Sequence, residues 1–241
     1  MQKKKTGTLI ILAWPDSLAL KIGMWYDRPM KWLGFNKNDF YKVGHAAIVL
    51  VNHETGHLHY FDFGRYHTPE KQGRVRDELT DPDIIIREHA MLDEEGHIYN
   101  LESILLEIAS NKATHGTGKM VSSVYSGMDF KGSFAKAKEI QSRGAVNYGP
   151  FDMTGTNCSR FVATVAKAGI LDPITKLLMG LPYTLTPTPI FDVKVISNKG
   201  VAYEVENNRV LIKYNKMLNI RSLDSKITKS NEPELATSLL T

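Results

Sequence analysis

The only cysteine in the chain, Cys158, lies where a helix is expected to begin. Asn157 is a good N-cap residue, and apolar residues follow it at helical spacing, which predicts a helix over residues 157–168. The helix dipole and the unpaired N–H groups of a first turn favour a thiolate and can also donate to an oxyanion. This is the position that a nucleophilic cysteine needs, although a small cysteine can also simply pack at a helix start.

A histidine begins an apolar segment more than a hundred residues before the cysteine. His45 opens the run Ala46 to Val51, which predicts a buried strand, and residues 52–56 and 58–63 predict a turn and a second strand of a hairpin. A base that takes the thiol proton needs a third group that holds its ring. Pairing Val51 with Gly56 places Asp62 opposite His45, so Asp62 is the predicted third residue, unless it pairs with Arg65 instead.

The residues around the cysteine also resemble a known family. Tyr148-Gly149 followed by Asn157-Cys158-Ser159 is similar to the segment before the nucleophile of NlpC/P60 cell-wall peptidases, but Asn157 replaces an Asp and Arg160 replaces a common Gly. The Asn-Cys-x-x-Phe form, with its histidine strand earlier in the chain, resembles the permuted branch that includes lecithin:retinol acyltransferase-like proteins. This resemblance covers about residues 7–168 and implies an α+β, permuted papain-like fold, with a small antiparallel sheet packed on the cysteine helix.

The resemblance implies a cysteine-dependent hydrolase or acyltransferase that acts on an amide or ester bond in a peptide, small-molecule or lipid substrate. In this interpretation Cys158 is the nucleophile, His45 the base and Asp62 the third residue. Lecithin:retinol acyltransferase-like members use a second histidine on the neighbouring strand, which makes His59 the alternative third residue. The residues expected to bind substrate or the oxyanion are Tyr148, Asn157 and Ser159. A non-catalytic binding module of the same fold is the alternative function.

A second motif, His53-Glu54-Thr55-Gly56-His57, matches the H-E-x-x-H pattern of zinc peptidases. That chemistry needs both histidines on one helix face, whereas Thr-Gly inside the motif and the flanking alternation predict a hairpin turn. A zinc peptidase is therefore the least favoured function. With His59 and His67 nearby, adventitious metal binding at the hairpin tip is favoured over metal catalysis, and we expect no cofactor and no catalytic metal.

The composition limits the partners, cross-links and location that we expect for the chain. The 241 residues carry 30 Lys and Arg against 26 Asp and Glu, a net charge of +4 that is spread along the chain, so we expect no nucleic-acid partner. One cysteine cannot form an internal disulfide and cannot by itself hold a structural zinc ion. We expect one catalytic domain over residues 1–221, a flexible tail over 222–241, and a cytoplasmic protein without integral membrane association, since no signal peptide or membrane span is evident.

The remaining elements follow from periodicity and turn residues. Helices are predicted over residues 18–32, 101–109, 133–142 and 157–168. Strands are predicted over residues 7–13, 44–51, 58–63, 83–89, 97–100, 193–196, 202–205 and 210–214. The Gly-, Ser- and Thr-rich residues 112–127 predict a loop, which together with the Pro-rich residues 181–189 would form walls of the cleft.

Overall fold

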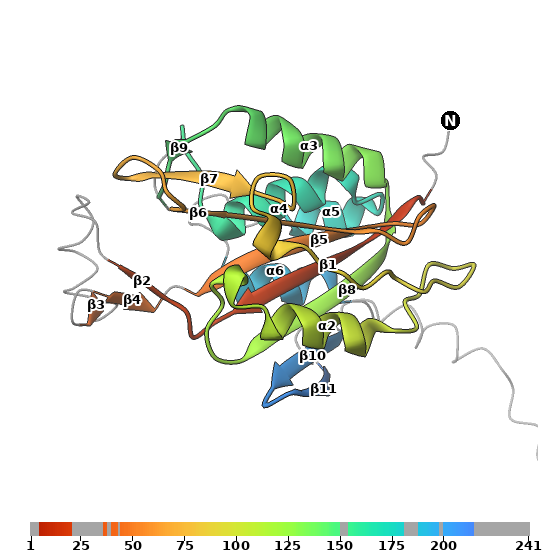
Figure 1. Cartoon of the computed structure of the whole chain (residues 1–241). Coiled ribbons are helices and arrows are strands. Elements are labelled where there is room, and N and C mark those ends of the chain that lie inside the picture. Colours follow the sequence, from red (N-terminus) through yellow and green to blue (C-terminus); the bar gives the residue numbers. More distant parts are fainter. Residues whose placement is uncertain are drawn as a thin grey trace, which may run out of the picture.

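The computed structural model describes residues 5–20, 36–37, 40–42, 44–149, 154–180, 188–197 and 200–214. Within them, eight strands form one antiparallel sheet in the order β11-β10-β8-β1-β5-β6-β7-β9 (Figure 1). Its strands are β1 (Gly7–Trp14), β5 (His45–Asn52), β6 (Leu58–Gly64), β7 (Gln72–Arg76), β8 (Met120–Met128), β9 (Val146–Asn147), β10 (Val201–Glu206) and β11 (Arg209–Tyr214). A second sheet contains β2 (Leu18–Leu20), β4 (Phe40–Lys42) and β3 (Asn36–Lys37).

Helices cover both faces of the large sheet. The helices are α2 (Leu101–Ser110), α3 (Phe130–Ser142), α4 (Cys158–Gly169), α5 (Pro173–Leu178) and α6 (Pro189–Ile196), with short 3-10 turns η1 (Pro82–Ile84) and η2 (Lys112–Thr114). Helices α3, α4 and α6 share a hydrophobic core with one face, and α2 shares a second core with the other (Figure 1). The predicted fold class, α+β with an antiparallel sheet packed on the cysteine helix, is confirmed.

The central strands β1 and β5 are buried on both faces. Along β5, Ala46, Ile48 and Leu50 face the core of α4, whereas Ala47 and Val49 face the core of α2. Because both faces are covered, these strands are continuous apolar runs rather than alternating ones, which is why they could be predicted from the sequence. His45 is the first residue of β5 and lies where this double burial ends.

The β5–β6 hairpin forms as predicted, but its register differs by two residues. Ala47 pairs with Asp62 and Val51 with Leu58, so Asp62 is not directly opposite His45. Gly56 belongs to the turn, with φ +70°, and a Cβ there would lie 2.7 Å from the carbonyl oxygen of Ala90. The predicted pairing of Val51 with Gly56 was therefore wrong. A shift of two residues keeps every side chain on its face, so Asp62 remains on the same face as His45.

Two segments near the site adopt a different structure from the predicted one. Residues 120–127 of the predicted loop belong to β8, which lies between β1 and β10, and its Ser122 and Ser123 are buried rather than exposed. Ser123, for example, donates its hydroxyl to the carbonyl of Val193 at 2.7 Å. The predicted strand at residues 193–196 is the end of α6, since Thr188 caps the helix by accepting from the Phe191 N–H and Pro189 occupies its first turn.

Other predictions were wrong or fall outside the described residues. Residues 18–20 form a strand rather than the start of a helix, while residues 21–32 lie outside the described part. Residues 82–84 form a 3-10 turn in place of the strand predicted from residue 83. The tail predicted from residue 222 and most of the Pro-rich segment also lie outside the described residues. No described helix has the length and apolar character of a membrane span.

Candidate active site

Cys158 is the first residue of α4. The Asn157 side chain accepts a hydrogen bond from the Arg160 N–H at 2.9 Å, which confirms the predicted N-cap. The face of the helix that carries Phe161, Val162 and Val165 packs in the core against β5 and β6, so the helix start is held against the end of the histidine strand. Cys158 is 6% exposed and is a free thiol.

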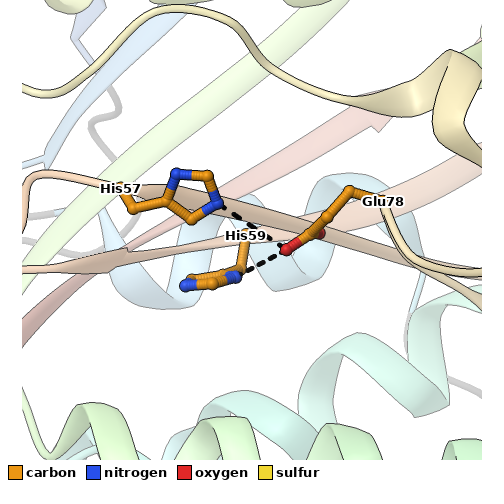
Figure 2. A group of neighbouring side chains, drawn as sticks. All are labelled: His57, His59 and Glu78. Atoms are coloured by element: carbon orange, nitrogen blue, oxygen red, sulfur yellow. Dashed lines mark hydrogen bonds and ion pairs between the residues drawn. The ribbon is translucent and has the colours of Figure 1, made fainter.

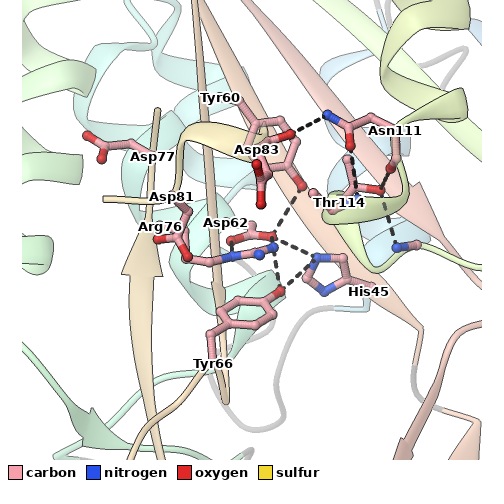
Figure 3. Close-up of polar contacts among 12 residues, drawn as sticks. His45, Tyr60, Asp62, Tyr66, Arg76, Asp77, Asp81, Asp83, Asn111 and Thr114 are labelled. Atoms are coloured by element: carbon pink, nitrogen blue, oxygen red, sulfur yellow. Dashed lines mark hydrogen bonds and ion pairs between the residues drawn. The ribbon is translucent and has the colours of Figure 1, made fainter. Parts of the chain in front are cut away.

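The structure brings the His45 ring between Cys158 and Asp62. His45 Nε2 lies 3.3 Å from Asp62 Oδ2 (Figure 3), and the imidazole is also near enough to the Cys158 thiol for each group to shift the pKa of the other. Because Nε2 faces the carboxylate, Nδ1 is the nitrogen that remains for the sulfur. Trp14 stacks against the ring with centroids 5.7 Å apart. The strand enters this position through Gly44, whose φ of +72° and close approach to the Trp14 carbonyl favour glycine.

Three residues that the sequence analysis did not single out hold the Asp62 carboxylate. Arg76 on β7 donates to both oxygens, at 3.0 and 2.6 Å, and Tyr60 and Tyr66 donate their hydroxyls at 3.2 and 3.0 Å (Figure 3). The Arg76 guanidinium also lies 3.5 Å from the centroid of the Tyr66 ring. Asp62 is therefore fully satisfied by four partners, and the ion pair with Arg65 considered above is replaced by one with Arg76.

Arg76 was missed because the residues leading to it are polar and were interpreted as a connection. They form β7, which pairs with β6 and places Arg76 directly opposite Asp62. The alternation of Val75 with Arg74 and Arg76 was the available signal. Tyr60 could have been found from the period of two, because it lies on the same face of β6 as Asp62.

The charges of the site favour an ion pair between sulfur and imidazole. Burial alone lowers the pKa of His45, but the hydrogen bonds and negative charges of Asp62 and Cys158 outweigh it and raise the pKa to about 9. Burial alone raises the pKa of the Cys158 thiol, but His45, the Ala46 N–H and the Ser159 hydroxyl lower it overall. Burial also opposes ionisation of Asp62, yet His45 and Arg76 hold its pKa below the ordinary value. These shifts all favour the ionised forms, a thiolate paired with an imidazolium beside a carboxylate.

The other predicted site residues have separate positions. His59 bonds through Nδ1 to Glu78 at 2.7 Å and packs against Phe134 of α3, so it lies on the face of β6 opposite Asp62 and does not serve His45. The Ser159 side chain is buried and helps to lower the pKa of the Cys158 thiol. Asn157 uses its side-chain oxygen as the cap.

Tyr148 packs beneath the loop that leads to the cysteine. Its ring stacks on Phe63 with centroids 5.8 Å apart, and the guanidinium of Arg65 lies 5.6 Å from its centroid. A bridge to Thr156 ties the residue to the loop before α4. The role of Tyr148 in holding an oxyanion stays a prediction, as do those of Asn157 and Ser159.

A buried acid lies close to the thiol. Asp192 on α6 is 0% exposed, and among the described residues neither of its carboxylate oxygens has a hydrogen-bond partner. Burial and the negative charge of Cys158 raise the pKa of Asp192 well above its ordinary value. The neutral form of this carboxyl is therefore favoured to a higher pH than in an ordinary aspartic acid. Because residues 193–196 were expected to be a strand, the sequence analysis did not place Asp192 near the site.

The zinc-peptidase motif does not form a helix. Its residues make up the turn between β5 and β6, and His53 bonds through Nε2 to the Thr8 hydroxyl at 2.9 Å. His57 instead lies beside Glu78. The two histidines of the motif therefore have different partners, which the geometry of an H-E-x-x-H zinc site does not allow.

Fold and site together define a class of protein. An antiparallel sheet packs on a helix that begins with the cysteine, and the histidine strand precedes that helix in the chain, which is the permuted papain-like arrangement. The model of the type VI secretion system effector TseH-like family matches residues 9–172, a span that includes His45, Asp62 and Cys158. The chain belongs to the TseH-like family of type VI secretion system effectors.

A solved structure supports the same fold. The crystal structure of the type VI secretion system effector TseH is similar to this chain with a TM-score of 0.56 and 20% sequence identity, over 87% of this chain and 98% of that one. At this identity the likeness supports the fold alone. None of the curated proteins matches the chain.

Proposed function

We propose that this chain is a cysteine-dependent hydrolase or acyltransferase of the permuted NlpC/P60 type that acts on an amide or ester bond. The observation that carries the proposal is the chain of contacts from Cys158 through His45 to Asp62. A structural cysteine gains nothing from a buried imidazole with a raised pKa, whereas a nucleophile does.

In the proposed reaction, the Cys158 thiolate attacks the substrate carbonyl and forms a tetrahedral intermediate. The backbone N–H groups of Cys158 and Ser159 belong to the first turn of α4, which cannot satisfy them internally, so they are placed to donate to the oxyanion. The intermediate then collapses to a thioester, and the His45 imidazolium gives its proton to the departing amine or alcohol. His45 next takes a proton from water, or from a second acceptor, as that nucleophile attacks the thioester and releases the thiolate.

Asp62 has a positioning role in this scheme. Its carboxylate fixes the His45 ring and stabilises the imidazolium, while Arg76, Tyr60 and Tyr66 keep the carboxylate in place. Four hydrogen-bonding partners make rotation of the carboxylate costly, so the ring is held before substrate binds. As a member of an effector family, the chain would carry out this reaction on a component of a recipient cell.

The proposal is tested by labelling and toxicity together. Iodoacetamide should alkylate Cys158 rapidly at pH 6.5, and His45→Ala should slow the reaction by at least tenfold. The chain should harm cells that express it, either in the cytoplasm or when exported from it, and Cys158→Ser should abolish that harm at equal protein levels. Analysis of accumulated products, with water and amines or alcohols as competing acceptors, separates hydrolysis from acyl transfer.

A matched control is His97→Ala. His97 is also hydrogen-bonded to a carboxylate, Asp93, at 2.8 Å, but it lies on the surface away from the cysteine helix. It should leave both labelling and toxicity unchanged. Toxicity that persists in Cys158→Ser would instead support the non-catalytic binding module.

A further inference from the structure

A second group of ionisable side chains lies at the other end of β6. His57 immediately precedes this strand, His59 is its second residue, and Glu78 comes from the turn that follows β7 (Figure 2). Both rings are directed at one oxygen of Glu78. Oε1 lies 2.7 Å from His59 Nδ1 and 3.7 Å from His57 Nε2. This group is separate from the active site, because His59 and Asp62 are three residues apart and on opposite faces of the strand.

The fold holds all three side chains in place. His57 and His59 are two residues apart where the chain enters β6, and their ring centroids are 4.4 Å apart. The His59 ring is supported by Phe130 and Phe134 of α3. Glu78 is positioned by its neighbour Asp77, whose side chain accepts from two backbone N–H groups of the turn and pairs with a lysine of α3.

The spacing of these atoms suits a transition-metal ion. In a tetrahedral zinc site with bonds of about 2.1 Å, neighbouring ligand atoms lie about 3.4 Å apart. The 3.7 Å separation of His57 and Glu78 is already near this value, and the ligand atoms of His57, His59 and Glu78 all lie within 4.8 Å of one another. The contact between His59 and Glu78 would have to lengthen by about 0.7 Å. A metal ion between these two groups would replace the proton that now joins them.

One atom of the group also lacks a partner that a metal ion would supply. Among the described residues, the second oxygen of Glu78 is buried without a hydrogen-bond partner, and a cation would satisfy that acceptor.

We propose that His57, His59 and Glu78 form a binding site for a divalent transition-metal ion of the zinc class. Two imidazoles and a carboxylate supply three ligands, and water completes the coordination on the side where His57 is 31% exposed. A bound ion would tie the turn after β7 to the start of β6. Since the same strand pair carries Arg76 and Asp62, the metal would stiffen the support of the active site without entering its chemistry.

The test must distinguish this site from the Cys158 thiolate, which also binds zinc. Full-length protein carrying Cys158→Ser is stripped with chelator and titrated with Zn²⁺ by calorimetry. We expect one equivalent to bind, and we expect His59→Ala or Glu78→Gln in the same background to weaken binding at least tenfold. Co²⁺ substitution should give visible d–d absorption without a thiolate charge-transfer band. His97→Ala, which removes the histidine of a surface pair with Asp93, should change neither result.

Thermal unfolding gives a second measurement of zinc binding. Zn²⁺ should raise the melting temperature of the Cys158→Ser protein and should not raise that of the Glu78→Gln variant, whose side chain is nearly isosteric and should fold normally without metal. Absence of zinc binding in Cys158→Ser would overturn the proposal. So would binding that His59→Ala and Glu78→Gln leave unchanged. Neither result bears on the thiol chemistry, because the nucleophile is absent from these proteins.

Discussion

The substitution Asp62→Asn isolates the electrostatic part of the proposed mechanism. The side chain keeps its shape but loses the negative charge that lies 3.3 Å from His45 Nε2. It also leaves the Arg76 guanidinium, now 2.6 Å from Asp62, without its carboxylate. Both changes disfavour a positive charge on His45. Because the imidazolium in turn stabilises the thiolate, the pKa of Cys158 should rise.

The size of the effect follows from the raised pKa of His45. An ordinary histidine titrates at 6.5 and His45 at about 9, which corresponds to roughly 3 kcal/mol in favour of the protonated ring. Asp62 and Cys158 share this stabilisation and must also overcome burial. Assigning about half to Asp62 predicts that Asp62→Asn lowers the pKa of His45 by about one unit. Because the imidazolium stabilises the thiolate, the pKa of Cys158 should rise by up to the same amount, so the thiolate fraction at a pH below that pKa falls by up to about tenfold.

The assay is the pH dependence of alkylation by iodoacetamide, which is uncharged and reports the thiolate fraction. The midpoint should lie below the ordinary thiol value in the unmodified chain and move upward in Asp62→Asn. Asp81→Asn is the matched control, because it removes the carboxylate of the parallel Arg74–Asp81 pair, at 2.7 Å, without touching His45. An unchanged midpoint in folded Asp62→Asn protein would refute the electrostatic argument.

Three further predictions concern pH and stability. Turnover should fall as pH rises through about 9, because the His45 imidazolium that protonates the leaving group is lost there. The rate of alkylation, which needs only the thiolate, should not fall, and pH profiles of the two rates check this. Because the pKa of Asp192 is raised in the folded state, the free energy of unfolding should decline as pH rises above about 4, and Asp192→Asn should reduce this decline. Urea unfolding at pH 4 and pH 7 measures the change, and a variant that is less stable than the unmodified chain at pH 7 would indicate a paired carboxylate. Gly56→Ala should cost about 1–3 kcal/mol of unfolding free energy, because φ is +70° and the Ala90 carbonyl blocks a Cβ. Denaturant unfolding measures this loss, and an unchanged stability would show that the turn relaxes.

The parts of the fold that the sequence predicted well are those with one dominant local signal. The double burial of β5 makes it an unbroken apolar run, and α4 combines a capping Asn157 with an apolar stripe. Strand β8 has no such signal. Its buried Ser123 is satisfied by a distant group, the α6 carbonyl that accepts its hydroxyl, and that partner is known only once the chain has folded.

The candidate site was predictable in its residue types and less so in its surroundings. Asp62 was correctly placed on the face of His45 although the hairpin register was wrong by two residues, because a period of two preserves the face. An error of one residue would have placed it in the α4 core. Arg76 and Tyr66 depend on the pairing of β7 and on the path of the chain after β6, which polar segments do not specify locally.

The position of His45 explains why the three groups of the site can meet at all. Cys158 comes from the helix layer on one face of the sheet, while Asp62 shares the other face with Tyr60. Inside β5 a side chain reaches one face only: Ala46 lies in the core of α4 and Ala47 in that of α2. At the first residue of the strand, the ring can contact the carboxylate through Nε2 and the thiol through its other nitrogen, beside the Ala46 N–H that also bonds the sulfur. A histidine moved to position 46 or 47 would therefore lose one of its two partners.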